Sequence, residues 1–175
     1  MTNMKIIKSI LICMMSIMAL SSCDKEEYEP LPIPTGAGQI LVECIGNNGR
    51  TILDDPKFID KISIEGQASH SKINYDIRNS GIQKCLAFNA EMPNQLDMKW
   101  NKEHTEASGI SKMTIKFGKN KVTLSCHIKY VANRPPAAAG GCAILEEVSC
   151  NGMNFKRSGN SVTITLRMDK NGKLL

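Results

Sequence analysis

Histidines, cysteines and paired acids are the side chains of this 175-residue chain that could carry out chemistry. The three histidines, His70, His104 and His127, stand far apart, and none accompanies a serine or cysteine motif. Cys126 and His127 are adjacent, so in a strand their side chains would point to opposite faces. No Cys-x-x-Cys, His-Glu-x-x-His, Gly-x-Ser-x-Gly or phosphate-binding loop occurs. We therefore predict no catalytic residue, no metal site and no cofactor.

Acidic residues pair at Asp54-Asp55 and Glu146-Glu147. Neighbours in a strand face opposite ways, so Glu146 and Glu147 could act on one substrate only if the strand had a bulge. Residues 169–172, Asp-Lys-Asn-Gly, resemble the start of a calcium loop, but the later ligands do not follow and we expect a turn.

Residues 1–22 have the composition of a secretory signal peptide. Lys5 and Lys8 are their only charges, and the apolar run at residues 9–20 carries none. At ~1.5 Å per residue this run covers only about 18 Å of a ~30 Å hydrocarbon core. It is therefore too short for a transmembrane helix.

Leu20, Ser21, Ser22 and Cys23 close this segment. They resemble the lipobox of bacterial lipoproteins, in which the cysteine thiol receives a diacylglyceryl group and the peptide is cut just before it. The resemblance implies that Cys23 is lipidated and becomes the first residue of the mature chain. Two or three acyl chains, at ~0.8 kcal/mol per buried methylene, would then anchor the protein to a membrane.

Residues 23–35 predict an extended acidic tether, in which Pro30, Pro32 and Pro34 fix φ. Lys25, Glu26 and Glu27 lie directly behind the cysteine and resemble the lipoprotein export signal of Bacteroidetes. That resemblance implies attachment to the outer membrane with the protein facing the cell exterior. Attachment facing the periplasm is the alternative.

The remaining residues, 36–175, are long enough for one domain with its own core. They carry 19 basic and 13 acidic residues, a net charge of +6 spread along the segment. The lysines of residues 112–122 alternate with apolar residues, as on the wet face of a strand, rather than forming a cluster. This pattern does not favour a nucleic-acid partner.

Five cysteines remain in this segment, in an exported compartment that permits disulfides. The number is odd, so at least one thiol stays free or pairs between chains. Cys142 and Cys150 flank a stretch that predicts a single strand, which would hold them ~26 Å apart and forbid a bridge. Cys44 and Cys126 fall on apolar faces by alternation, and Cys85 on a wetter face. We expect at most two disulfides, without Cys142–Cys150.

Alternating apolar residues predict half-buried strands nearly throughout residues 36–175. The alternating sets are Ile40, Val42 and Cys44; Ile62 and Ile64; Ile73, Tyr75 and Ile77; Leu86, Phe88 and Ala90; Leu96, Met98 and Trp100; Met113, Ile115 and Phe117; Val122, Leu124, Cys126, Ile128 and Tyr130; and Val162, Ile164, Leu166 and Met168. Residues 54–61 could form a short helical turn, Asn151-Gly152 predicts a hairpin, and residues 134–141 an exposed loop. Trp100, the only tryptophan, is expected in the core rather than as a sugar-stacking platform.

Eight to ten strands with one apolar face each must pack those faces against one another. We predict an all-β fold, an antiparallel β-sandwich that is immunoglobulin-like only in its general architecture, with a barrel as the alternative. The cysteine–tryptophan–cysteine spacing of true immunoglobulin domains is absent.

The lipobox, the acidic tether and the segment NNGRTILDD at residues 47–55 together resemble the small lipoproteins of Bacteroidales. This resemblance implies no catalytic residues. We expect a non-catalytic, lipid-anchored module that binds a glycan, a protein or a partner in the cell envelope. The alternative is a small hydrolase or an inhibitor built on the sandwich.

Overall fold

The computed structural model describes residues 37–81, 83–133 and 140–175. Cys23 and the Lys25-Glu26-Glu27 motif lie outside the described residues, as does most of the loop predicted at residues 134–141. No helix in the described segments is long and apolar enough to cross a membrane. The two helices that they contain are α2 (Pro56–Ile59) and the single 3₁₀ turn η1 (Gln95–Asp97).

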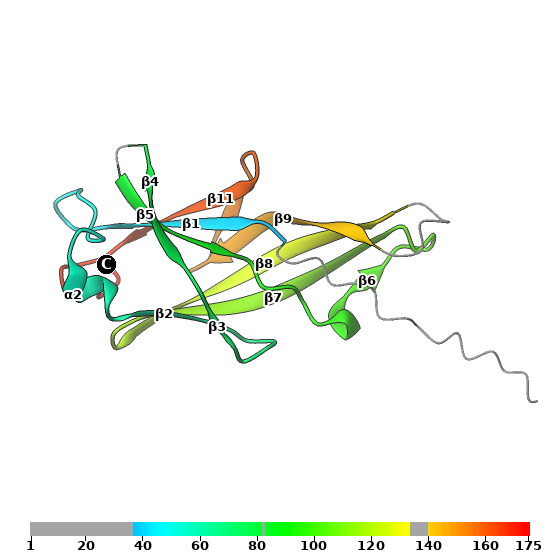
Figure 1. Cartoon of the computed structure of the whole chain (residues 1–175), viewed down its shortest axis with the longest axis horizontal. Helices are drawn as coiled ribbons and strands as arrows, with labels where there is room; N and C mark the ends of the chain where they lie inside the picture. The colour runs from blue at the N-terminus through cyan, green and yellow to red at the C-terminus, as the bar shows by residue number, and fades with distance from the viewer. Residues whose placement is uncertain (1–36, 82, 134–139) are drawn as a thin grey trace, which may run out of the picture. The chain divides into compact units, whose positions relative to one another are not determined.

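Two β-sheets make up the described structure (Figure 1). The first has four strands in the order β11 (Ser161–Arg167), β1 (Gln39–Ile45), β5 (Gln83–Asn89) and β4 (Asp76–Ser80). The second has seven, in the order β10 (Met153–Lys156), β9 (Gly141–Cys150), β8 (Asn120–Ala132), β7 (Glu106–Phe117), β2 (Ile62–Gly66) and β3 (Lys72–Ile73), with β6 (Lys99–Trp100) paired to β7. Neither sheet closes on itself, so the predicted all-β sandwich is confirmed and the barrel alternative is wrong.

The core lies between the two sheets, as the period-two pattern requires. Alternate residues of β1 and β11 face alternate residues of β7 and β8, and all of them are buried. The predicted helical turn is α2, which begins where the Asp55 carboxylate accepts the N–H of Lys57. It closes one end of the core, because Phe58 stacks on Phe117 with ring centroids 5.8 Å apart.

Three local predictions are confirmed. β9 is a single strand through residues 141–150, and Asn151 and Gly152, with φ of 50° and 78°, form the two-residue turn into β10. Residues 169–173 form a turn, in which the Asp169 carboxylate accepts the N–H groups of Asn171 and Lys173 at 2.8 and 2.9 Å. That carboxylate is thereby used for backbone hydrogen bonds rather than left open for a cation.

Two expectations on strands were wrong. Residues 73–77 do not form one strand: β3 and β4 belong to different sheets, so the chain crosses the sandwich between them. Residues 96–100 alternate in hydrophobicity, yet they form η1 and only a two-residue strand, and Leu96 is 97% exposed. Within the confirmed sandwich one pair of strands, β1 with β11, is parallel, and the other strand pairs of the two sheets are antiparallel.

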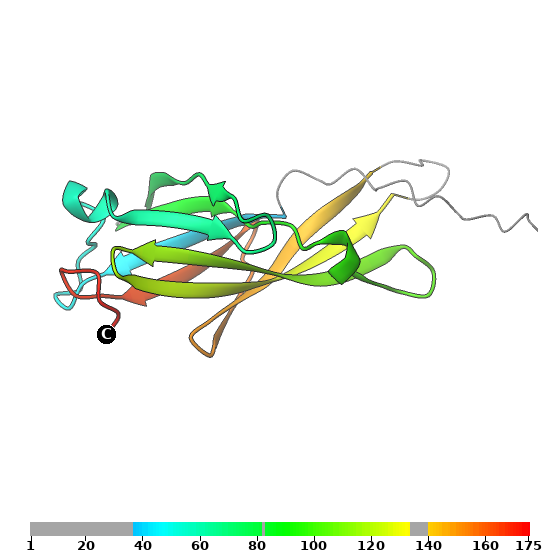
Figure 2. The ribbon, with the colours of Figure 1, turned by 90° about the horizontal axis from the view of Figure 1, so that it is seen from below.

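The seven-stranded sheet reaches beyond the four-stranded one (Figure 2). In the near half, residues 112–117 of β7 and 120–125 of β8, the inner face packs against the other sheet. In the distal half, residues 106–111 and 126–132, Cys126 and Ile128 still belong to the core. Beyond them the seven-stranded sheet continues past the four-stranded one, with β6 at its edge. There the cover comes from the connection between β5 and β6: Pro93 and Met98 lie so close over Gly109 that a Cβ at that position would come within 2.5 Å of the Met98 sulfur.

Candidate functional site

The distal half carries an aromatic cluster in one row across its inner face. Trp100 of β6 pairs with Ala107 of β7, which pairs with Tyr130 of β8. The rings of Trp100 and Tyr130 meet edge to face, with centroids 5.8 Å apart. His104, in the loop between β6 and β7, stacks on Trp100 at 6.0 Å. These three residues are called the Trp100 cluster below.

Trp100 is only half-buried, so the expectation that it belongs to the core was wrong. The expected strand at residues 96–100 does not form, and the indole instead lies on the seven-stranded sheet where the four-stranded sheet no longer covers it. Its aromatic neighbour His104 is exposed. A half-buried tryptophan stacked on an exposed imidazole presents apolar ring surface beside polar edges.

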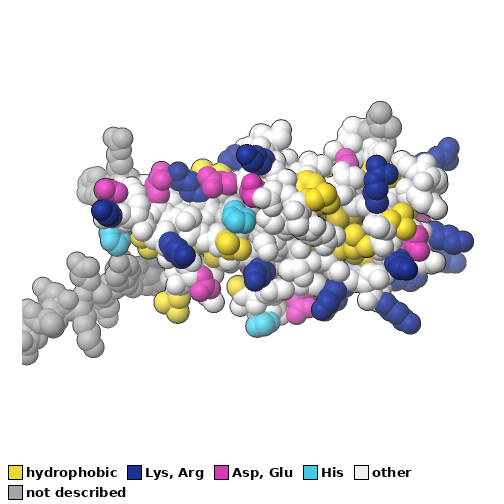
Figure 3. Space-filling model, turned by 180° about the vertical axis from the view of Figure 1, so that it is seen from behind, with side chains coloured by type: hydrophobic (Ala, Val, Ile, Leu, Met, Phe, Trp, Pro, Cys, Tyr) yellow, Lys and Arg dark blue, Asp and Glu magenta, His cyan; other side chains and the backbone are white. Residues whose placement is uncertain are grey.

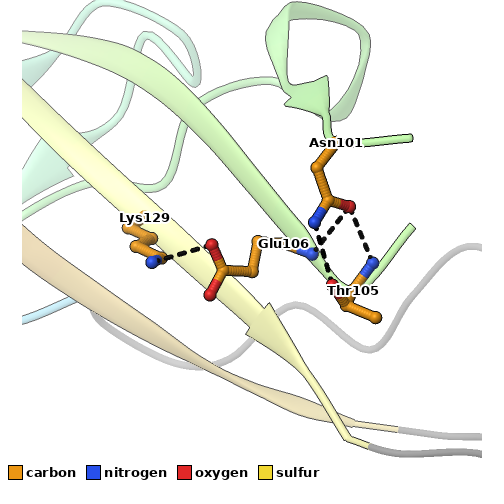
Figure 4. A network of polar contacts seen from close by, with 4 residues as sticks. All are labelled: Asn101, Thr105, Glu106 and Lys129. Atoms are coloured by element: carbon orange, nitrogen blue, oxygen red, sulfur yellow. Dashed lines mark hydrogen bonds and ion pairs between the residues drawn. The ribbon is translucent and has the colours of Figure 1, made fainter. Parts of the chain in front are cut away.

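A polar network fixes the loop that carries His104 (Figure 4). The Asn101 side chain accepts the N–H groups of Thr105 and Glu106 at 2.9 and 3.2 Å, and its amide donates to the Thr105 hydroxyl at 2.9 Å. Glu106 in turn pairs with Lys129 of β8 at 2.8 Å. These bonds hold His104 at a φ of 52°, which few residues adopt. The loop is therefore ordered before any ligand arrives.

Tyr130 is the second unusual residue of this site. Its side chain is 3% exposed, its ring lies over the backbone of Gly141, and burial raises the pKa of its phenol. The hydroxyl has no hydrogen-bond partner in the part of the chain that the structure describes. A buried hydroxyl without a partner destabilises a fold, and a hydrogen-bonding group that reached it would restore that loss.

Glu91 attaches the connection between β5 and β6, which covers the distal half, to the neighbouring turn. Its carboxylate accepts the N–H groups of Ser69 and Ala68, at 2.9 and 3.3 Å, in the turn between β2 and β3. The same carboxylate lies against Gly66. The cover of the distal half thus depends on side-chain contacts rather than on a strand ladder.

All five cysteines of the described segments are free, within the expected limit of two disulfides and without a Cys142–Cys150 bridge. Burial raises the pKa of both Cys44 and Cys126 from 9.0 to about 12, so these thiols are poor nucleophiles. Cys85 is buried, which corrects its assignment to a wet face. It lies at the centre of the four-stranded sheet, where Glu43 and Arg78 flank it on the neighbouring strands.

Glu146 and Glu147 occupy a β-bulge. The register of β8 and β9 shifts there: His127 pairs with Glu147, and Ile128 pairs with Leu145. Both acids therefore lie between the buried Leu145 and Val148, and both face away from the core. The bulge that the sequence could not predict thus places the two carboxyl groups on one face.

The histidines stay apart, as their spacing indicated. His70 lies in the turn between β2 and β3, His104 in the Trp100 cluster and His127 on the outer face of β8. No group of three or more metal-ligating side chains occurs in residues 37–81, 83–133 and 140–175.

Sequence reasoning missed the supporting residues Asn101, Thr105, Glu106 and Lys129. The run Trp-Asn-Lys-Glu-His-Thr at residues 100–105 held the available signal, because asparagine side chains often hydrogen-bond to nearby backbone groups in turns.

No protein-family model, no curated protein and no solved structure matches this chain. The geometry of the site and the sequence therefore carry the functional argument.

Proposed function

We propose that this chain is a lipid-anchored, non-catalytic binding module on the exterior of the bacterial outer membrane, and that the Trp100 cluster binds a glycan. The lipobox that ends in Cys23 and the Lys25-Glu26-Glu27 motif support the anchor and its location. The observation that carries the binding site is the preordered His104–Trp100 stack beside the unpaired Tyr130 hydroxyl.

A glycan fits this chemistry better than a protein does. The C–H face of a sugar ring packs on the negative face of an aromatic ring, and sugar hydroxyls supply hydrogen-bond partners. The Tyr130 hydroxyl lacks such a partner, and because it is buried a glycan reaches it only when the cover over the ring moves. Tryptophan and histidine supply the ring surface, whereas the Glu106–Lys129 pair lies on the opposite face of the sheet and supports the loop from there.

A pair of matched histidine variants tests the glycan site. His104 and His70 are both exposed and both have positive φ, 52° and 53°, and asparagine tolerates this conformation. The detergent-solubilised full chain is first screened on a glycan array, and the glycans that bind are then titrated against His104→Asn and His70→Asn. We expect His104→Asn to weaken binding about tenfold, the loss of one aromatic contact of ~1.5 kcal/mol, while His70→Asn leaves it unchanged. Equal affinities for the two variants, or an array without any bound glycan, would contradict the proposal.

The anchor is tested separately. Cys23→Ala should abolish labelling by a fatty-acid probe and processing by the lipoprotein signal peptidase. Unchanged labelling would refute lipidation of Cys23. Replacing Lys25, Glu26 and Glu27 by alanine should change the protein from protease-accessible to protected in intact cells. A wild-type protein that is already protected would refute the exterior location.

The hydrolase alternative has one observation in its favour, the bulge that places Glu146 and Glu147 on one face. Two carboxyl groups facing one substrate can act as acid and base on a glycosidic bond. If a glycan that binds is also cleaved, and if Glu146→Gln with Glu147→Gln stops the cleavage, the chain is an enzyme and the non-catalytic proposal is wrong.

A further inference from the structure

A group of exposed lysines gathers at the end of the sandwich opposite the Trp100 cluster. It comprises Lys57, Lys61, Lys119, Lys121, Lys170 and Lys173, all exposed and here called the basic end. Figure 3 shows dark-blue side chains crowded at its right-hand end, which is the α2 end in the orientation of Figure 1.

Three chain segments that carry these lysines touch one another. The Gly118 N–H donates to the carbonyl of Lys61 at 2.9 Å, which joins the β7–β8 turn to the end of α2. The Asn120 amide donates to the Gly172 carbonyl at 3.0 Å, and Phe58 of α2 packs on the backbone of Gly172. The lysines therefore share one surface although they are far apart in the sequence.

The fold gathers at this end charges that are spread along the sequence. Residues 55–61, 118–121 and 169–173 hold six lysines and three aspartates, a net charge of +3. Residues 36–175 as a whole have a net charge of +6, from 19 basic and 13 acidic residues. Half of the net charge thus lies on 16 of 140 residues.

These lysines are not used to hold the fold. None of them takes part in the four salt bridges of the described residues, which involve Arg78, Lys84, Lys116 and Lys129. Of the three aspartates, Asp55 and Asp169 accept backbone N–H groups, so their carboxylates are turned to local turns. Asp60 follows α2 as its C-cap. Unpaired like charges that repel one another favour an anionic partner.

We propose that the basic end binds an anionic polysaccharide that carries sulfate or carboxylate groups along an extended chain. Phe58 and Phe117, beneath these lysines, are 4% and 1% exposed. Tyr75, the half-buried ring beside α2, donates its hydroxyl to the carbonyls of Ile59 and Ile62, so no fully exposed ring offers a platform for a nucleic-acid base. Of the large apolar side chains that are exposed, Leu175 alone follows these segments, and one leucine gives little insertion into a bilayer.

The direction of β1 supports a partner outside the membrane, an argument that depends on the proposed anchor. The described chain enters the sandwich at Ala37 beside Leu145, and β1 then runs seven residues toward the basic end. The basic end is therefore remote from the point at which a tether from Cys23 would join the domain.

The test compares two triple variants of the detergent-solubilised full chain that remove the same charge. Lys61→Gln, Lys119→Gln and Lys173→Gln take one lysine from each segment of the basic end. Lys72→Gln, Lys112→Gln and Lys156→Gln remove three exposed lysines that form no salt bridge and lie elsewhere. The probe is dextran sulfate, with neutral dextran as the reference.

We expect the wild type to bind dextran sulfate and not neutral dextran. The basic-end triple should weaken binding by about tenfold or more and the control triple by less than about twofold. Binding should also fall with added salt, as the Debye length decreases from ~10 Å at 0.1 M to ~3 Å at 1 M. The basic-end triple should leave binding at the Trp100 cluster intact, so failure at one site does not affect the other.

Equal weakening by the two triples would show that net charge alone acts, and it would overturn the proposal. Equally tight binding of double-stranded DNA, or binding to anionic vesicles without binding to dextran sulfate, would overturn the assignment to a polysaccharide.

Discussion

In the near half of the seven-stranded sheet, the inner face of β7 and β8 carries Met113, Phe117 and Leu124, each exposed by 1% or less. In the distal half the same face of the same strands carries Ala107, Gly109 and Tyr130. The near half packs on a second sheet, whereas the distal half is covered by a connecting segment and β6.

The difference shows how one pair of strands can serve two purposes. Large apolar residues fill the near half because burying them supplies the stability of the fold. Ala107 and Gly109 in the distal half leave room for Pro93, Met98 and the Trp100 cluster, whereas Cys126 and Ile128 of β8 still belong to the buried core. We infer that the near half holds the fold and that the distal half holds the binding site.

The largest expected effect comes from truncating an aromatic residue in the near half. Phe117→Ala removes a fully buried ring that stacks on Phe58, and it should lower the free energy of unfolding by ~3–5 kcal/mol. Trp100→Ala, at the half-buried site, should cost less than half as much. Urea denaturation of the full chain measures both. Equal losses would mean that the Trp100 cluster is as much part of the core as Phe117.

Alkaline pH should destabilise the core through its thiols. The pKa of Cys44 and of Cys126 rises from 9.0 to about 12, chiefly through burial. The unfolded chain loses these protons above about pH 9 while the folded chain keeps them, so stability is complete below pH 9 and is lost as pH rises toward 12. Each thiol contributes a slope of at most ~1.4 kcal/mol per pH unit.

Urea unfolding at pH 8.5 and pH 10 measures this slope. The double variant Cys44→Ala, Cys126→Ala is the control and should flatten it. A wild-type protein whose stability is constant over this interval would show that the thiols are not held in a dry core.

A smaller effect is expected where the cover of the distal half is attached. Glu91→Ala removes the acceptor of two backbone hydrogen bonds and should cost ~1–2 kcal/mol. Glu103→Ala, at an exposed residue of the β6–β7 loop, is the control and should be neutral. We expect Glu91→Ala also to weaken glycan binding, because Met98 and Pro93 belong to the same connection. Unchanged binding would show that the cover does not position the Trp100 cluster.

Alternation of apolar and polar residues predicted the strands of the near half well. Met113, Ile115 and Phe117 all face the same buried layer, so every second residue there is apolar. In the distal half, alternation did not predict the structure. Residues 96–100 alternate too, but they pair with β7 only at Lys99 and Trp100, so alternation gave a false strand and a false core position for Trp100.

Other features depend on partners that are distant in the sequence. The bulge at Glu146 arises from the register of β9 against β8, which no local pattern contains. The burial of Cys85 depends on its neighbours across two strands, Glu43 and Arg78. The basic end likewise exists only because three separated turns meet at one end of the sandwich.

Tyr130→Phe tests the central claim, that the distal half is kept for binding at the expense of stability. The variant removes only the buried hydroxyl that has no partner in the described residues. We predict a free energy of unfolding that is unchanged or up to ~1 kcal/mol higher, together with glycan binding that is about five- to tenfold weaker. Binding at wild-type affinity, or a loss of stability, would contradict the claim, because the hydroxyl would then serve no ligand or would already be satisfied by the fold.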